Sequence, residues 1–374
     1  MSRRILFLEV LPTISGGQRA LLDLIPGLAD CELHALLPAS GPFEQSLADL
    51  GVTCHFCDMP QFTLVNKGMG DSVRMLASLP RLAVQTARLA RRLDIELIYA
   101  NNGRAFVWGT PGAMLAGRPI LWHMHNVLGD AKSERLIRGM AHVDAVKRIV
   151  SVSDNANRPF AHLDKAAVIP LGVDTLRFRP DHTAREQIRA ELRVGADTFC
   201  VGCIGDLIAL KGQDTIVRAA ARLPDVAFLL IGESREGSSE SHEYAVRLRR
   251  TAGPNVRLLG QREDIPQILN ALDLLIIASQ TETGPRVLLE AMASGIPVLS
   301  TPVGRAAELV RPGITGELLA IRDAAALVHK IRTLREQPLR CKEVGARARQ
   351  VALEELSMGT FHRRMRQEIE LALS

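Results

Sequence analysis

The chain has 374 residues and a formal net charge of +5, with 46 basic and 41 acidic side chains. This charge excess is too small to indicate a nucleic-acid-binding protein, and an aromatic content of 4% leaves few rings for stacking on bases. Hydrophobic residues make up 47% of the chain and charged residues 23%, which is the balance of a globular protein. The sequence contains no run of about eighteen apolar residues, so we predict no membrane-spanning helix. The length of the chain favours two domains.

The first half of the chain alternates short apolar runs with helical patterns. Residues 5–10 predict a first buried strand, which leads through Gly16 and Gly17 into a helix over residues 18–29. Glu9 lies inside this apolar run, which favours a strand over a signal peptide. Further strands are predicted over residues 31–37, 97–100, 120–123 and 148–152. This alternation is typical of a parallel sheet covered by helices.

The second half repeats this pattern after a break at residues 167–180, which contain two prolines and a glycine. Strands are predicted over residues 199–204, 227–231, 256–259, 274–278 and 297–300, and helices over residues 213–223, 265–272 and 286–293. We therefore predict an α/β protein with two doubly wound Rossmann-like domains, residues 1–170 and 171–357. The last helix, within residues 358–374, is expected to pack back on the first domain.

Cysteine and histidine patterns give little support for a metal site. The pairs Cys54/Cys57 and Cys200/Cys203 lie in strand-like runs, where an offset of three places the thiols on opposite faces. We interpret them as small buried residues in a reducing cytosol. His123 and His125 share one face of a strand, but no third ligand follows nearby. We therefore expect no metal and no cofactor.

The residues richest in chemistry follow the predicted strand 274–278. That strand ends in a polar turn with Glu282, and Pro285 suits the start of the next helix. Helix N-termini offer N–H groups and a positive dipole end, which suit a diphosphate. Glu290, further along the helix, is placed to accept hydrogen bonds from ribose hydroxyls. The alternative interpretation is an acidic helix start followed by an exposed glutamate.

Two other loops suggest phosphate binding. Lys211 lies in the loop after the first strand of the second domain, where a lysine can neutralise a leaving diphosphate. A solvated loop lysine is the alternative interpretation. In the first domain, Gly16 and Gly17 precede a helix, and two glycines let backbone approach a phosphate closely.

These separate signals resemble one family. Glu282 and Glu290 bracket seven residues, as in the acidic-x7-acidic signature of retaining glycosyltransferase family 4. That family has the GT-B fold, so the resemblance implies two Rossmann-like domains facing each other across a cleft. The other segments that resemble the family follow in the expected order, and they are residues 16–17, His125, and residues 169–180, 205–212 and 301–308.

The resemblance also implies roles for residues. Glu290 would hold the ribose of a nucleotide diphosphate sugar, and Glu282 the donor sugar. Lys211 would neutralise the leaving diphosphate, and His125 would touch the transferred sugar near the acceptor. Backbone groups near Arg262 would contact the base. The remaining donor-binding residues that the resemblance implies are Gly17, Gly284, Pro285, Arg286 and Val287.

One position departs from the family in a way that affects the phosphates. Asp206 stands where the family usually has arginine, and a carboxylate near a diphosphate repels it. We expect Asp206 to pair with Arg286 or Arg305, which would orient a guanidinium toward the diphosphate in place of the missing arginine. Leu171, where the family often has asparagine, is a minor departure at the hinge.

The expected function is that of a cytoplasmic, metal-independent, retaining glycosyltransferase. It would move a sugar from a nucleotide sugar to a glycan or lipid-linked acceptor, in the synthesis of a cell-envelope polysaccharide or glycolipid. One alternative is a non-catalytic GT-B subunit that binds a nucleotide sugar, and Asp206 is its best support. A second alternative is a sugar-nucleotide epimerase, against which the acidic-x7-acidic segment favours transfer.

Four arginines predict a basic stripe on one helix of the first domain. Arg74, Arg81 and Arg88 are spaced seven apart, and Arg92 follows one turn later. One interpretation is an ordinary solvated helix face. The other is peripheral contact with an anionic membrane surface on the inner side, which would suit a lipid-linked acceptor.

Overall fold

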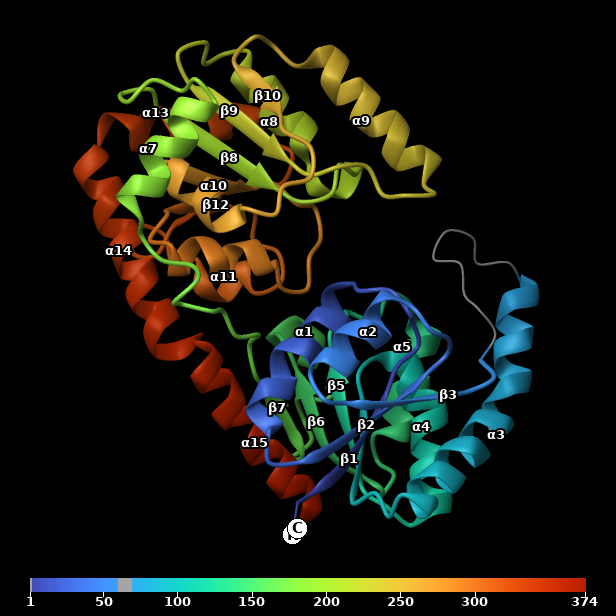
Figure 1. Cartoon of the computed structure of the whole chain (residues 1–374). Coiled ribbons are helices and arrows are strands. Elements are labelled where there is room, and N and C mark those ends of the chain that lie inside the picture. Colours follow the sequence, from blue (N-terminus) through green and yellow to red (C-terminus); the bar gives the residue numbers. More distant parts are fainter. Residues whose placement is uncertain (1, 60–68) are drawn as a thin grey trace. The chain divides into compact units, whose positions relative to one another are not determined.

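The computed structural model describes residues 2–59 and 69–374, and it describes side chains in the helix after residue 68 from residue 77 onward. The chain divides into two compact units (Figure 1). Unit 1 consists of Met1–Leu171 and Gly359–Ser374, and unit 2 consists of Gly172–Met358. Each unit is built on its own parallel sheet.

Unit 1 contains a seven-stranded parallel sheet in the order β3-β2-β1-β4-β5-β6-β7. Its strands are β1 (Arg4–Leu8), β2 (Glu32–Leu37), β3 (Thr53–Phe56), β4 (Leu97–Ala100), β5 (Ile120–Met124), β6 (Val146–Ser151) and β7 (Ala166–Val168). Its helices are α1 (Gly16–Leu24), the 3₁₀ turn η1 (Ile25–Leu28), α2 (Pro42–Asp49), α3 (Met69–Arg92), α4 (Gly103–Ala116), α5 (Ala131–Met140), α6 (Asp154–Asn157) and α15 (Met358–Leu373).

The central strands of unit 1 are buried along their whole length. Every residue of β4 and β5 is buried, because helices cover both faces of the sheet. Trp122 of β5 stacks on Phe106 of α4 with ring centroids 4.5 Å apart, and its indole N–H donates to Thr110. The first predicted helix is shorter than expected, because Pro26 converts residues 25–28 into a 3₁₀ turn.

The C-terminal helix α15 is fixed to unit 1 by polar contacts. Arg148 of β6 forms an ion pair with Glu368. His362 contacts the carbonyl of Asp23 at 2.7 Å, and Arg366 donates to the carbonyl of Gly27 at 2.6 Å. Figure 1 shows this helix, in red, lying along unit 1. The end of the chain is therefore part of the first compact unit.

Unit 2 contains a six-stranded parallel sheet in the order β10-β9-β8-β11-β12-β13. Its strands are β8 (Cys200–Ile204), β9 (Ala227–Ile231), β10 (Val256–Leu258), β11 (Leu274–Ile277), β12 (Val298–Ser300) and β13 (Glu317–Leu318). Its helices are α7 (His182–Glu191), the 3₁₀ turn η2 (Ala209–Lys211), α8 (Gln213–Ala220), α9 (Ser239–Thr251), α10 (Ile265–Ala271), α11 (Arg286–Ala293), α12 (Ala306–Leu309), α13 (Ala324–Glu336) and α14 (Pro338–Glu355).

A partly buried charge cluster attaches α7 to the sheet of unit 2. Asp273, just before β11, pairs with Arg185 at 2.7 Å and with the buried Arg189 at 3.4 Å. Its carboxylate also accepts the backbone N–H of Cys200 at 2.8 Å. Because a partly buried carboxylate that loses a partner is left poorly compensated, loss of either arginine would weaken this attachment.

The cysteines form no disulfide, and all six are free. Burial raises the pKa of Cys200 and of Cys203 to about 12, so both thiols are inert. Among the described residues, no group of three or more histidine, cysteine or acidic side chains is arranged to hold a metal ion. Within the same ranges, no helix is long and apolar enough to cross a bilayer.

Candidate functional site

Each sheet reverses its strand order at one place. The reversal lies between β1 and β4 in unit 1 and between β8 and β11 in unit 2. In open α/β sheets, ligands bind beyond the carboxyl ends of the strands at this switch point, because the flanking loops diverge there. The loops after these four strands are therefore the expected ligand-binding segments of the two units.

The switch point of unit 2 carries an ion pair. Lys211, in the turn η2 after β8, pairs through its Nζ with the Oε1 atom of Glu282 in the loop after β11. The two side chains are 25% and 17% exposed, so the pair is largely screened from water but remains reachable. Ser279 Oγ donates to the same Glu282 oxygen at 3.0 Å. Gly205, at φ +149°, adopts a backbone conformation that other residues rarely adopt, and it lies next to the Lys211 side chain.

The loop after β12 supports the turn that carries Glu282. Thr301 Oγ1 donates to the carbonyl of Ser279 at 2.6 Å. The backbone N–H of Arg305 donates to the carbonyl of Thr283 at 3.2 Å. Gly304 has φ +49°, and a Cβ there would collide with the Thr283 carbonyl. The position of Glu282 is therefore fixed by one side-chain and one backbone hydrogen bond from a second loop, and by the close approach of Gly304.

The helix α11 begins directly after this turn. Pro285 is its N-cap residue, and no side chain among the described residues caps it. Gly284 lies against the stem of Arg305, and Arg286 and Val287 are the first two residues of the helix. Their N–H groups and the helix dipole give this end a partial positive charge. Glu290 lies one turn further along and is half-buried.

The structure corrects the prediction for Asp206. Its carboxylate pairs with Arg235 Nε at 2.7 Å, not with Arg286 or Arg305. Arg305 instead pairs with Glu308. The reason is the strand order: the loop after β9, which carries Arg235, is next to the loop after β8, whereas β11 and β12 lie on the other side. Both partners are at least half exposed.

Arg262 has a structural environment. It lies after β10, two strands away from the switch point. Its guanidinium pairs with Asp264 at 2.7 Å and with Glu191 of α7 at 2.9 Å. The hydrogen bonds that the guanidinium donates to these two carboxylates raise the pKa of Arg262. The side chain is thus committed to α7 and to its own loop.

The switch point of unit 1 brings together Gly17, His125 and Asn101. His125, after β5, contacts Asn101 Oδ1 through its Nε2 at 2.9 Å. Asn101, after β4, donates through its Nδ2 to the carbonyl of Gly17 at 3.0 Å. A Cβ on Gly17 would lie 3.5 Å from the His125 ring. Two of the sequence-predicted residues are therefore neighbours, linked by an asparagine that the sequence analysis did not single out.

Glu9, directly after β1, is a further residue at this switch point that the sequence patterns did not assign to the site. Its side chain is fully buried. Burial raises the pKa of Glu9 from 4.5 to about 7, although the hydrogen bonds that it accepts favour the carboxylate. The signal was visible as an acidic residue at the end of the first apolar run.

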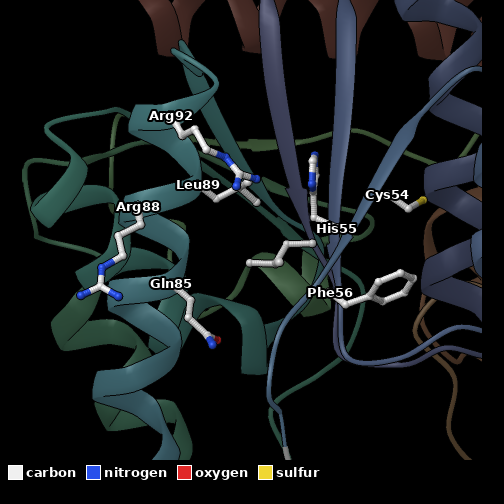
Figure 2. Close-up of a pocket in the computed structure, with 8 residues that line it drawn as sticks. Cys54, His55, Phe56, Gln85, Arg88, Leu89 and Arg92 are labelled. Atoms are coloured by element: carbon white, nitrogen blue, oxygen red, sulfur yellow. The ribbon is translucent and has the colours of Figure 1, made fainter.

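A groove of about 480 Å³ lies between the edge strand β3 and the helix α3. Figure 2 shows Arg92 extending from α3 toward the strand that carries His55, and Arg88 pointing away from that strand. Burial, and then the nearby His34 and Arg92, lower the pKa of His55.

Of the predicted basic stripe, Arg81 pairs with Asp58. The Arg74 side chain lies outside the described residues.

Comparison with known proteins agrees with this architecture. Residues 184–351 match the model of the family glycosyl transferases group 1. The *Anabaena* protein HepE, solved with UDP, is 26% identical, has a TM-score of 0.85, and is matched over 98% of this chain and 99% of its own. The fold is GT-B. This confirms the predicted fold class.

Two further comparisons, one with a solved structure and one with a sequence relative, extend this result. HepE solved with UDP-glucose is 25% identical at a TM-score of 0.81, over 98% of this chain and 99% of its own. A D-inositol 3-phosphate glycosyltransferase from *Mycobacterium bovis* (strain BCG / Pasteur 1173P2) is 32% identical over 187 residues, which are 48% of this chain. That match covers 38% of the length of the mycobacterial protein.

Proposed function

We propose that this chain is a retaining glycosyltransferase that moves a sugar from a nucleotide diphosphate sugar to an acceptor hydroxyl without a bound metal. The observation that carries the proposal is the Lys211–Glu282 pair beside the start of α11. It lies at the switch point of unit 2, inside the segment that matches the glycosyltransferase family model. A cation and a helix N-terminus at one place suit a diphosphate.

The proposed chemistry depends on the exchange of one partner of Lys211. When the bond between the anomeric carbon and the phosphate oxygen breaks, negative charge develops on the leaving diphosphate. Lys211 and the first N–H groups of α11 stabilise this charge, and Glu282 then accepts hydrogen bonds from sugar hydroxyls. The acceptor oxygen forms the new bond to the anomeric carbon on the same face. Its proton passes to the leaving phosphate oxygen.

The remaining assignments follow from the resemblance. Glu290 would bind the ribose hydroxyls, and the loop around Arg262 would contact the base through backbone groups. Unit 1 would contribute Gly17 beside the diphosphate and His125 beside the transferred sugar. Because HepE was solved with UDP and with UDP-glucose, uridine nucleotides are the first donors to try.

Binding and transfer test the proposal in two stages. A thermal-shift screen of UDP, GDP and ADP and their sugars should give one stabilising base, because a ligand at one hundred times its Kd adds roughly 2.7 kcal/mol. With that donor, transfer to an acceptor should persist in EDTA, and NMR should find the anomeric configuration of the donor in the product. Inversion would defeat the mechanism. Binding without transfer or hydrolysis would favour a non-catalytic subunit, and a new sugar nucleotide without acceptor would indicate an epimerase.

We also propose that the acceptor is lipid-linked or a glycan at the inner face of a membrane, which places the protein in the cytoplasm. The exposed arginines Arg88 and Arg92 of α3 support contact with anionic lipid, at about 1 kcal/mol for each arginine. Co-sedimentation with anionic but not with neutral vesicles is the expected result. Loss of that binding in Arg88→Ala/Arg92→Ala, but not in the α14 variant Lys342→Ala, would assign it to this helix. Equal binding to both vesicle types would contradict the proposed contact with anionic lipid.

A further inference from the structure

The fully buried Glu9 is surrounded by hydrogen-bond donors. Its Oε1 accepts from Asn101 Nδ2. Its Oε2 accepts from Gln18 Nε2 at 2.8 Å, from the backbone N–H of Val10 at 3.2 Å and from Asn102 Nδ2 at 3.3 Å. Four N–H groups aimed at one carboxyl group match a carboxylate, because a protonated acid would have to donate toward other donors.

Backbone groups fix the orientation of the side-chain amides in this shell. The oxygen of Gln18 accepts the backbone N–H of Ser15 at 3.3 Å, so its nitrogen must face Glu9. The oxygen of Asn102 accepts two backbone N–H groups in the first turn of α4, at 3.1 and 3.0 Å, so its nitrogen faces Glu9 as well. The arrangement of donors around Glu9 is therefore set by the starts of α1 and α4.

The third side-chain amide, that of Asn101, contacts both Glu9 and His125. Asn101 Nδ2 points to two acceptors, the Glu9 carboxylate and the carbonyl of Gly17. Its oxygen must then point the other way, and it faces His125 Nε2 at 2.9 Å. A carbonyl oxygen can only accept, so Nε2 carries the proton. In the neutral ring, Nδ1 is then a hydrogen-bond acceptor, which suits a donating hydroxyl of a sugar.

We propose that Glu9 is a positioning residue that, through Asn101, holds His125 as the Nε2–H tautomer. The role of the tautomer in transfer rests on the proposed function, but the tautomer itself does not. Glu9 is fully buried, so it acts through Asn101 and not by contact with substrate. A histidine whose tautomer is fixed by an outer partner presents one defined nitrogen to its ligand.

Among the described residues, two titratable groups that lie beside this network are Tyr99 and His123. Tyr99 of β4 and His123 of β5 contact each other through the tyrosine hydroxyl and Nδ1, and the His123 ring lies 4.0 Å from that of His125. Burial lowers the pKa of His123 and raises that of Tyr99, so both are neutral near pH 7. The raised pKa of Glu9, about 7, means that its carboxylate forms only toward the upper end of the neutral range.

The first test is made on the unaltered protein. Long-range ¹⁵N–¹H NMR spectra of histidine-labelled protein at pH 8 report which ring nitrogen is protonated, and the signal that disappears in His125→Gln is assigned to His125. The expected result is the Nε2–H tautomer. An Nδ1–H tautomer or an equal mixture would overturn the proposal, whatever any variant shows.

The second test changes Glu9. In Glu9→Gln, the new amide oxygen is best placed toward the three donors on the Oε2 side, so its NH₂ group confronts the NH₂ of Asn101. Asn101 must flip or withdraw, and His125 should lose its Nε2–H preference. Glu9→Asp keeps an acceptor-only group and should retain it. His123 is the internal control, and its signal should not change.

Activity provides a separate measurement. Glu9→Gln should lower kcat by roughly 10–100-fold, the size typical when an outer partner that orients a metal-binding histidine is replaced, with a smaller loss in Glu9→Asp. A folded Glu9→Gln protein that keeps the Nε2–H tautomer would overturn the proposal. If Glu9→Gln does not fold, the His125 tautomer in the unaltered protein and in Glu9→Asp still tests the proposal. If the unaltered protein transfers no sugar from any donor, the proposed function fails, but the tautomer result stands.

Discussion

Each switch point brings a side chain from the loop after the first strand of its unit against one from the loop after the fourth strand, but the surroundings of the two pairs differ. In unit 1, Glu9 follows the first strand and meets Asn101 after the fourth. In unit 2, Lys211 follows the corresponding first strand and meets Glu282 after the corresponding fourth. Glu9 is fully buried among neutral amides, whereas the Lys211–Glu282 pair is partly exposed.

This difference in burial gives the residues at the two switch points different roles. A buried carboxylate whose acceptor sites are filled by four N–H groups cannot exchange partners with a ligand, so it organises the residues around it. A partly exposed ion pair can release each partner to an incoming charge at modest cost. The strand order selects the position, and burial decides what the residue there can do.

The largest expected effect lies in unit 2. Lys211→Ala should reduce kcat by a factor of roughly 10²–10³, because charge on the leaving diphosphate loses its cation in a preorganised site. Steady-state transfer kinetics with the best donor measure this, and Lys342→Ala, an exposed lysine of α14, is the matched control. Near-normal turnover would return Lys211 to the role of a structural partner of Glu282.

The next effect concerns the cost of burying Glu9. Its pKa is raised from 4.5 to about 7, so the folded state binds the proton more tightly. The resulting stability is fully present below pH 4.5 and is lost as the pH rises through about 7, an effect of about 3 kcal/mol. Glu9→Gln lacks this titration. Raising the pH from 5 to 8 should therefore lower the melting temperature of the wild-type protein relative to that of Glu9→Gln. A constant difference would show that Glu9 has an ordinary pKa.

Glu290→Ala should weaken donor binding by roughly 2–3 kcal/mol, because ribose hydroxyls lose charge-assisted hydrogen bonds to a carboxylate. The donor KM should rise more than kcat falls. Calorimetry with the nucleoside diphosphate measures the same loss without turnover, and Glu355→Ala, at the exposed end of α14, serves as the control. Unchanged affinity in a folded variant would remove Glu290 from the donor site.

The smallest effect concerns Asp206 and Arg235. Arg235→Ala leaves the Asp206 carboxylate without its recorded partner, and we expect the donor KM to rise by roughly 3–10-fold through repulsion of the diphosphate. The double variant Asp206→Ala/Arg235→Ala should recover most of this loss. The effect is modest because both side chains are at least half exposed and are screened by solvent. If the single and double variants behave alike, Asp206 does not face the phosphates.

The sequence by itself determined the local features of this protein. Apolar runs separated by helical patterns predicted two parallel sheets, and strands such as β4 and β9 lie where the runs indicated. The spacing of Glu282 and Glu290 could be read directly, because a turn and one helix connect them. These features depend on backbone periodicity and on neighbours within a few residues, which a linear pattern records.

Only the tertiary structure decided which loops meet. Glu9 and Asn101 are separated by 92 positions, and Asp206 and Arg235 by 29. Strand order, not distance along the chain, places each pair together, which is why the predicted partners of Asp206 were wrong. Burial is likewise a property of the packed sheet. The apolar run around Glu9 can be read in the sequence, but only the packed fold buries its side chain, raises its pKa and brings the donors of Gln18, Asn101 and Asn102 to it.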